Sequence, residues 1–75
     1  MEDNSRIVID PNVCGGKPCV HGTRIMVTSL LGMFAGGYTV KRILRAYPEL
    51  VQEDISAALE YAGRVVDEDK VIVRS

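Results

Sequence analysis

Residues 15–27 constrain the fold of this chain more than any other stretch, because glycines, a proline and alternating apolar residues crowd together there. Short β-prone pieces at 19–20 and 25–27 flank a break at Gly22 and Thr23. This order predicts a strand, a tight turn and a second strand. Most of the sequence that follows has helical periodicity, so the chain divides into a β-turn beginning and a helical remainder.

The residue types of the turn motif in this stretch are explained by the backbone conformations that a turn requires. Glycine turns through positive φ or lets the backbone approach another group closely, and proline fixes φ. The Gly-Gly-Lys-Pro run is not a phosphate-binding P-loop, since it lacks the spaced glycine and the Lys-Ser/Thr pair that starts a helix. We therefore interpret it as a structural turn that displays Lys17 and Arg24. Its members are Gly15, Gly16, Pro18, Gly22 and Thr23.

The residues before this motif predict one more strand. Residues 7–9 are β-branched, and the Asp-Pro-Asn run at 10–12 supplies turn chemistry that ends the strand at Asp10. Together with the pieces at 19–20 and 25–27, the strand at 7–9 would complete a sheet of two or three strands. The edges of such a small sheet need to be covered.

Two short helices are predicted between Thr28 and Pro48 from the spacing of their apolar residues. The first has Thr28 as its N-cap and the glycine pair 36–37 as its stop. The second is capped by Thr39 and stopped by Pro48. The polar faces of the second helix carry Lys41, Arg42 and Arg45.

A third helix is predicted from Val51 or Gln52 to about Arg64. Its apolar stripe consists of Ile55, Ala58, Leu59 and Ala62. Its exposed residues would include Gln52, Glu53, Asp54, Ser56 and Glu60. Phosphate would be repelled by so acidic a face.

Three helices behind a small β element predict a mainly α fold with a tri-helical helix-turn-helix core. We expect a single domain, 1–75, with a β-hairpin/turn element at 6–27 and the three-helix unit at 28–64. The tail, 65–75, would contain an acidic turn at 67–69. Its apolar trio, 71–73, is predicted to be a strand or a docking arm.

Charge is unevenly distributed along the chain, although the formal net charge is only −1. Between Pro11 and Pro48 there are five cations and no carboxylate, whereas the remainder holds four cations and all ten carboxylates. This asymmetry indicates either an anionic partner or a dimer in which acidic and basic regions meet. If DNA is bound, the predicted phosphate contacts are the second-helix cations Lys41, Arg42 and Arg45. The alternative for these three side chains is a solvated helical face.

The size and composition of the chain predict that it self-associates. A chain of 75 residues buries only about 60% of its unfolded surface, yet 47% of this one is hydrophobic, mostly aliphatic. We expect a homodimer with strand 7–9 at the interface between the two subunits, with or without 71–73.

The sequence shows neither a membrane span nor a signal peptide. No apolar run approaches the ~18 residues of a membrane span, and the acidic start lacks the cations of a signal peptide. We therefore expect the protein in the cytoplasm.

Metal and catalytic sites are not predicted. Cys14, Cys19 and His21 are three candidate zinc ligands, but a tetrahedral site needs a fourth, and the spacing to Asp10 is not that of a zinc finger. A Cys–His nucleophile pair would lack a third, orienting group. We therefore expect no cofactor and no enzymatic activity, with both cysteines as reduced thiols.

The quoted motifs together resemble a small bacterial family, domain of unknown function 433. The first half of the signature is Asp10-Pro11, Gly15-Gly16-Lys17-Pro18 and Gly22-Thr23-Arg24-Ile25 with Val27. The second half is Gly37-Tyr38-Thr39-Val40, Ile43-Leu44, Tyr47-Pro48-Glu49-Leu50 and Glu53-Asp54-Ile55, continuing through Tyr61-Ala62. The resemblance covers roughly residues 6 to 63. It implies a homeodomain-like helix-turn-helix fold and the antitoxin half of a toxin–antitoxin pair, often beside a PIN-like nuclease toxin, without enzymatic activity.

This chain departs from the family pattern at the start of the third helix. Thr or Ser commonly precedes Pro there, whereas this chain has Val51-Gln52. Loss of the N-cap hydroxyl should cost about 1 kcal/mol. His21 also stands where the family usually has Arg or Lys.

Two functions follow from these observations. The first is a non-catalytic antitoxin-like regulator that binds a PIN-like nuclease toxin and could also bind operator DNA. There Lys17 and Arg24 would face the nuclease, where a cation competes with the carboxylate-bound metal. Alternatively, Arg24 ties its loop to backbone carbonyls or to Asp10. The second function is a homodimeric interaction module without DNA binding.

Overall fold

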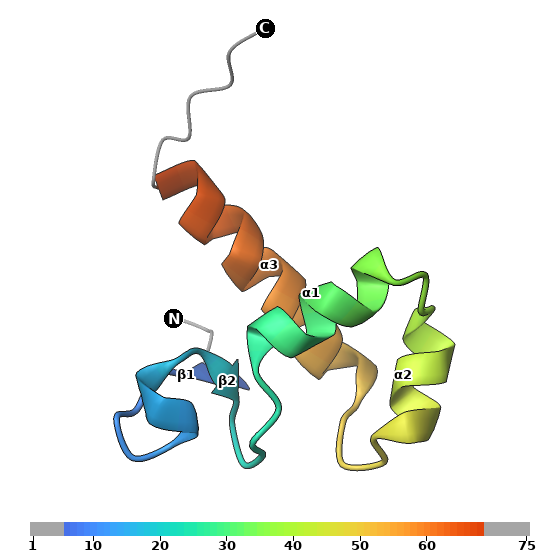
Figure 1. The fold of residues 1–75 in the computed structure, drawn as a ribbon, viewed down its shortest axis with the longest axis horizontal. Helices are drawn as coiled ribbons and strands as arrows, with labels where there is room; N and C mark the ends of the chain where they lie inside the picture. The colour runs from blue at the N-terminus through green and yellow to red at the C-terminus, as the bar shows by residue number, and fades with distance from the viewer. Residues whose placement is uncertain (1–5, 69–75) are drawn as a thin grey trace, which may run out of the picture.

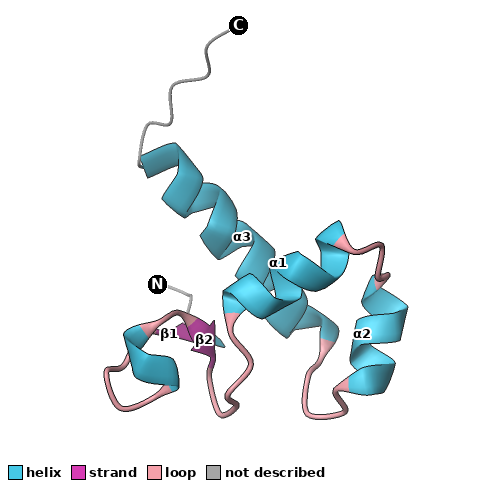
Figure 2. Ribbon diagram, viewed as in Figure 1, coloured by secondary structure: helices cyan, strands magenta, loops and turns pink. Residues whose placement is uncertain are grey.

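The computed structural model describes residues 6–68 of the chain. Its elements in order are β1 (Ile7–Val8), the 3₁₀ turn η2 (Cys14–Gly16), β2 (Cys19–Val20), α1 (Val27–Ala35), α2 (Val40–Ala46) and α3 (Gln52–Glu68). Figure 1 shows the small sheet at one end of α1 and α2 at the other, with α3 running behind α1. The predicted fold class is therefore confirmed: three helices form most of the structure and a two-stranded sheet precedes them (Figure 2).

The sheet pairs β1 with β2 in antiparallel register, Ile7 opposite Val20 and Val8 opposite Cys19. The predicted strand 7–9 was one residue too long, because Ile9 lies outside β1 and its side chain is 59% exposed. Asp10 instead starts a turn, in which its carbonyl oxygen accepts the Val13 N–H at 2.8 Å. The chain therefore leaves the sheet immediately after Val8.

The predicted strand at 25–27 is reduced to a single bridge between Cys19 and Met26. Its last residue, Val27, already begins α1, and the Val27 N–H donates to the Pro18 carbonyl oxygen at 3.0 Å. The Met26 carbonyl oxygen accepts the N–H groups of Ser29 and Leu30. Thr28 is thus inside the helix, and the prediction that it is the N-cap was wrong. Met26 holds that position without a side-chain cap.

The ends of α1 and α2 follow the predicted local signals. Gly37, with a φ of 95°, lets the chain reverse after α1. Its N–H donates to the Phe34 carbonyl oxygen, and the next N–H, of Tyr38, donates to the Met33 carbonyl oxygen. The Thr39 hydroxyl oxygen caps α2 by accepting the Arg42 N–H at 3.1 Å.

The third helix is longer than predicted. It continues past Arg64 to Glu68, so the first four residues of the predicted tail are helical. Asp67 and Glu68 therefore belong to α3 rather than to an acidic turn. The remainder of that turn and the trio 71–73 lie outside the described residues.

The core lies among α1, α2 and α3 and extends to the sheet through Ile7 and Val20. Its largest fully buried side chains are Leu30, Ile43, Ile55, Val20 and Cys19. In α3 the buried positions are Asp54, Ile55, Ala57 and Ala58, whereas Leu59 is 44% exposed. The predicted stripe was wrong at Leu59, because the buried face of α3 is formed by Ile55, Ala57 and Ala58 instead.

The helices within residues 6–68 offer no candidate for a bilayer crossing, since none combines the required length with an apolar composition.

Candidate nucleic-acid interface

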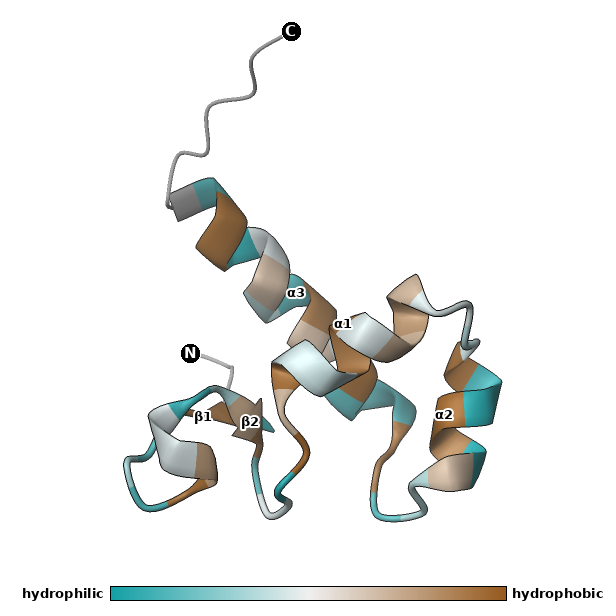
Figure 3. Ribbon diagram, in the orientation of Figure 1, coloured by the Kyte–Doolittle hydropathy of each residue, from teal (hydrophilic) through white to brown (hydrophobic). Residues whose placement is uncertain are grey.

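The second helix has one apolar and one cationic side. Ile43 is fully buried and fixes which face of α2 points toward the core. The side chains of Lys41, Arg42 and Arg45 are exposed. In Figure 3 the side of α2 that lies toward the other helices is coloured as hydrophobic, and its outer side is coloured as hydrophilic. The apolar anchor therefore determines that the three predicted DNA-contacting cations face solvent.

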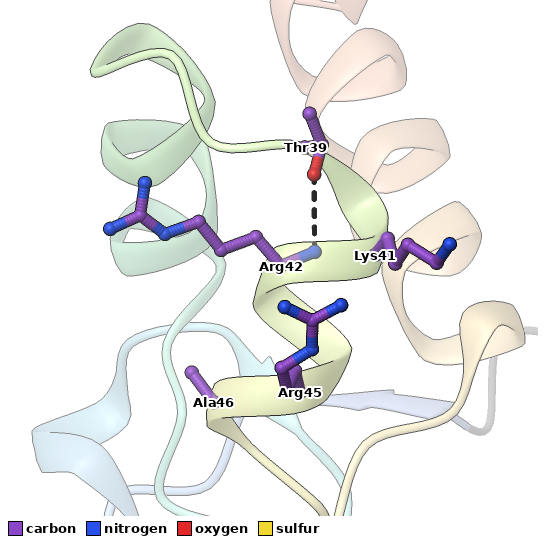
Figure 4. A pocket seen from close by; sticks show the side chains of 5 residues that line it. All are labelled: Thr39, Lys41, Arg42, Arg45 and Ala46. Carbon is purple, nitrogen blue, oxygen red and sulfur yellow. Dashed lines mark hydrogen bonds between the residues drawn. The ribbon is translucent and has the colours of Figure 1, made fainter.

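These three cations line one shallow depression of about 580 Å³, together with Thr39 and Ala46. In Figure 4 Lys41 and Arg42 extend to opposite sides of α2, and Arg45 lies between them. The guanidinium carbon of Arg42 lies 4.3 Å from the centre of the Tyr38 ring, a cation–π contact. Stacking restricts Arg42 while its N–H groups stay available to a phosphate oxygen.

The charge of this surface is not neutralised locally. Within residues 6–68, no carboxylate forms an ion pair with Lys41, Arg42 or Arg45. Three positive charges on two turns of one helix repel each other, so an anion placed between them relieves that repulsion. We call Lys41, Arg42 and Arg45 the α2 basic face.

The exposed surface of α3 is less acidic than the sequence predicted, because Asp54 is not part of it. Asp54 is 8% exposed, and its Oδ1 accepts a hydrogen bond from Nη1 of Arg6 at 2.9 Å within an ion pair. Its Oδ2 accepts the Val51 N–H at 2.9 Å. Asp54 thus supplies one half of a capping box, in which the side chain three residues after the N-cap accepts the N–H of the N-cap residue, although Val51 itself has no hydroxyl. The spacing of a capping box, from 51 to 54, was the sequence signal that could have revealed this role.

The remaining exposed side chains of α3 still argue against a standard recognition helix. Glu53 and Glu60 are exposed beside Gln52 and Ser56. Base-reading helices present donors to guanine and adenine and tolerate few carboxylates near phosphate. The arrangement therefore leaves the α2 basic face as the surface that suits a polyanion.

The loop cations Lys17 and Arg24 are both exposed. Arg24 lines a second depression, of about 660 Å³. The other lining residues are Val8, Asp10, Val13, His21, Gly22, Thr23 and Glu49. Lys17 does not line it, so the structure does not unite the two cations in one site. Among the described residues, neither an ion pair nor a hydrogen bond joins Arg24 to Asp10.

The turn motif holds Arg24 outward through Thr23. The Thr23 hydroxyl donates to the Val20 carbonyl oxygen at 2.9 Å and accepts the Ile25 N–H at 3.0 Å. Gly22 precedes it with a φ of 81°, a conformation that L residues rarely adopt. Gly15 and Gly16 also have positive φ, in η2. Side-chain hydrogen bonds and glycine together fix this turn.

Within residues 6–68, no cluster of three or more His, Cys, Asp or Glu side chains is placed to hold a metal ion.

Comparisons with known proteins agree on one family. Residues 7–62 match the family described as "Protein of unknown function (DUF433)". An uncharacterized protein of Sinorhizobium fredii is 39% identical over 56 residues, which are 75% of this chain and 25% of that protein. A crystal structure of a DUF433 member from Anabaena variabilis has a TM-score of 0.78 at 38% identity, covering 84% of this chain and 62% of that one. The chain thus spans only part of the length of both relatives. With more than half of its residues matched and a solved member sharing its fold, the chain belongs to the DUF433 family of proteins of unknown function.

Proposed function

We propose that this domain is a non-catalytic, antitoxin-like regulator that binds DNA phosphates through the α2 basic face. The observation that carries the proposal is the exposure of Lys41, Arg42 and Arg45 on one short helix without a carboxylate partner among the described residues. The antitoxin class comes from the resemblance of the signature motifs, and the helix-turn-helix arrangement of α2 and α3 is compatible with it. Binding of a PIN-like nuclease is a second part of the same proposal.

The α2 basic face would act as a phosphate anchor rather than as a base reader. Lysine and arginine side chains on a flexible stem reach phosphate oxygens and displace condensed counterions. Each neutralised phosphate contributes about −0.9 to the slope of log K against log salt concentration. Three contacts per chain therefore give a slope of about −2.7, and sequence preference is expected to be weak.

We expect Lys41→Ala to weaken DNA binding and to make the salt slope about 0.9 units shallower. The same change is expected for Arg45→Ala. The measurement is fluorescence anisotropy with a labelled duplex at several salt concentrations. Lys17→Ala is the matched control, because it removes the same charge from an exposed position outside α2.

The outcome of this titration also decides between the two candidate functions. Equal effects of Lys41→Ala and Lys17→Ala would mean that net charge, not the α2 basic face, governs binding. Absence of binding at low salt would contradict the DNA proposal and favour a homodimeric interaction module. That second function is supported by the exposed apolar side chains of α3, Leu59 at 44% and Val66 at 57%.

The proposed binding of a nuclease rests on the side chain of Arg24. It is exposed, has no ion-pair partner among the described residues, and is held outward by the Thr23 hydrogen bonds. A guanidinium placed among the carboxylates of a metal-dependent nuclease would compete with its metal ion. Truncating one partner of such a desolvated charge pair typically costs about 2–5 kcal/mol.

We expect Arg24→Ala to raise the concentration needed to neutralise the proposed PIN-like nuclease partner by at least ~30-fold, from the lower end of that range. The measurement is RNA cleavage by the nuclease at increasing concentrations of the domain. Arg24→Lys should retain part of the effect because it keeps the charge but loses the planar fork. Unchanged neutralisation by a folded Arg24→Ala variant, with folding checked by circular dichroism, would remove Arg24 from the interface.

A further inference from the structure

The depression that Arg24 lines is built from three segments of the chain. One wall comes from the residues at and after the end of β1, a second from the turn that carries Arg24, and a third from Glu49, in the loop between α2 and α3. Val8 and Val13, both half-buried, give it an apolar part. We call it the mixed-charge depression, and its ionised side chains are Asp10, Arg24 and Glu49.

The opposite charges of the mixed-charge depression do not neutralise one another. In the part of the chain that the structure describes, neither Asp10 nor Glu49 forms an ion pair with Arg24. Arg24 and Glu49 are exposed, and Asp10 is half-buried. All three charges are therefore available to a ligand with the reverse pattern, a cation for the carboxylates and a carboxylate for the guanidinium.

The backbone positions of the two carboxylate residues are fixed by local turns. Oδ1 of Asp10 accepts the Asn12 N–H at 2.9 Å. Glu49 precedes Leu50, which is 4% exposed and whose N–H donates to the Tyr47 carbonyl oxygen at 2.9 Å. Because both turns are already ordered, a ligand that binds here loses little affinity to the ordering of the chain.

A lysine or arginine side chain suits the mixed-charge depression better than a phosphate does. The aliphatic stem of such a side chain can pack on Val8 and Val13 while its charged end reaches the two carboxylates. Phosphate would be repelled by Asp10 and Glu49. The depression is therefore distinct in its ligand chemistry from the α2 basic face.

We propose that the mixed-charge depression receives a lysine or arginine side chain of the nuclease partner while Arg24 pairs with a carboxylate of the same partner. This inference rests on the proposed nuclease binding and adds the carboxylates Asp10 and Glu49 to that surface. A metal-dependent nuclease needs carboxylates for its metal ion and cations for its polyanionic substrate. The two carboxylates would occupy one of those cations, so the domain would block substrate binding as well as the metal site.

The chemistry of the site can be tested without the nuclease. The probe is Nα-acetyl-L-arginine, which carries one guanidinium and one carboxylate, and the control is Nα-acetyl-L-citrulline, which has nearly the same shape without the cation. Amide chemical shifts of the isotope-labelled protein report each titration. We expect a roughly millimolar dissociation constant for the arginine probe and at least ~10-fold weaker binding of the citrulline probe. The shifts should centre on residues 22–24 and Glu49. Equal shifts with both probes, or none with either, would overturn the proposal.

Charge reversal at Glu49 tests the contact with the nuclease. We expect Glu49→Lys to raise the dissociation constant of the complex with the proposed PIN-like nuclease by at least ~30-fold, because it brings like charges together. Glu60→Lys is the matched control, since it makes the same change at an exposed glutamate of α3 outside the depression. Its effect should be about fivefold or less, with the folding of both variants checked by circular dichroism.

The outcomes separate this inference from the nuclease proposal on which it rests. Equal effects of Glu49→Lys and Glu60→Lys would overturn the inference and leave the Arg24 contact standing. A wild-type protein that binds the arginine probe but not the nuclease would contradict the nuclease as the partner, whereas the site for a basic side chain would stand.

Discussion

We expect Leu30→Ala to lower the free energy of unfolding by about 3–4 kcal/mol. Leu30 is fully buried in α1, within the core that also contains Ile43 and Ile55. Removing its branched end loses the transfer free energy of the missing groups and leaves a cavity between the helices. A chain of 75 residues has a total stability of roughly 4–11 kcal/mol. The variant should therefore show a much lower urea midpoint by circular dichroism, and a large unfolded fraction in buffer if total stability is near the lower limit.

The matched control for this prediction is Leu59→Ala. It makes the same chemical change in α3, but Leu59 is 44% exposed. We expect a loss below about 1 kcal/mol, since little apolar surface returns to water and alanine favours helix. A loss as large as that of Leu30→Ala would mean that Leu59 is covered in solution, as in a dimer formed through α3. Sedimentation of the wild type would then show association.

The second large effect is expected for Asp54→Ala, with a loss of about 2–3 kcal/mol. This carboxylate bonds both the Val51 N–H at the start of α3 and the Arg6 guanidinium that precedes β1. Its removal leaves a partly buried N–H without its partner and breaks the ion pair that joins Arg6 to α3. Urea unfolding measures the loss, and faster amide exchange at Val51 should locate it.

Arg6→Ala distinguishes the cap from the ion pair. The Arg6 side chain is 46% exposed, so its pairing with Asp54 is screened by water and should contribute no more than about 1 kcal/mol. The double variant completes a thermodynamic cycle, in which we expect most of the Asp54 effect to persist without Arg6. If Arg6→Ala and Asp54→Ala were equally destabilising, the ion pair rather than the cap would be the main contribution.

Local sequence signals were sufficient to predict most of the fold. The glycine pair at 36–37 and the hydroxyl of Thr39 act on atoms only a few residues away, and both were predicted correctly. Pro48 likewise follows α2 closely, and α3 begins at Gln52, within the predicted range. The cationic side of α2 could also be predicted, because the apolar residues of so short a helix leave few alternatives for Lys41, Arg42 and Arg45.

The sequence by itself therefore determined the order of the elements, the turn motif and the location of the α2 basic face, because each depends on contacts within one turn of the chain. Only the tertiary structure decided two other features. Asp54 is a buried cap joined to Arg6, 48 residues away in sequence. Leu59 is exposed because packing against α1 sets the rotation of α3, which helical periodicity alone leaves undetermined. Such contacts depend on how separate segments pack, and no local pattern encodes their geometry.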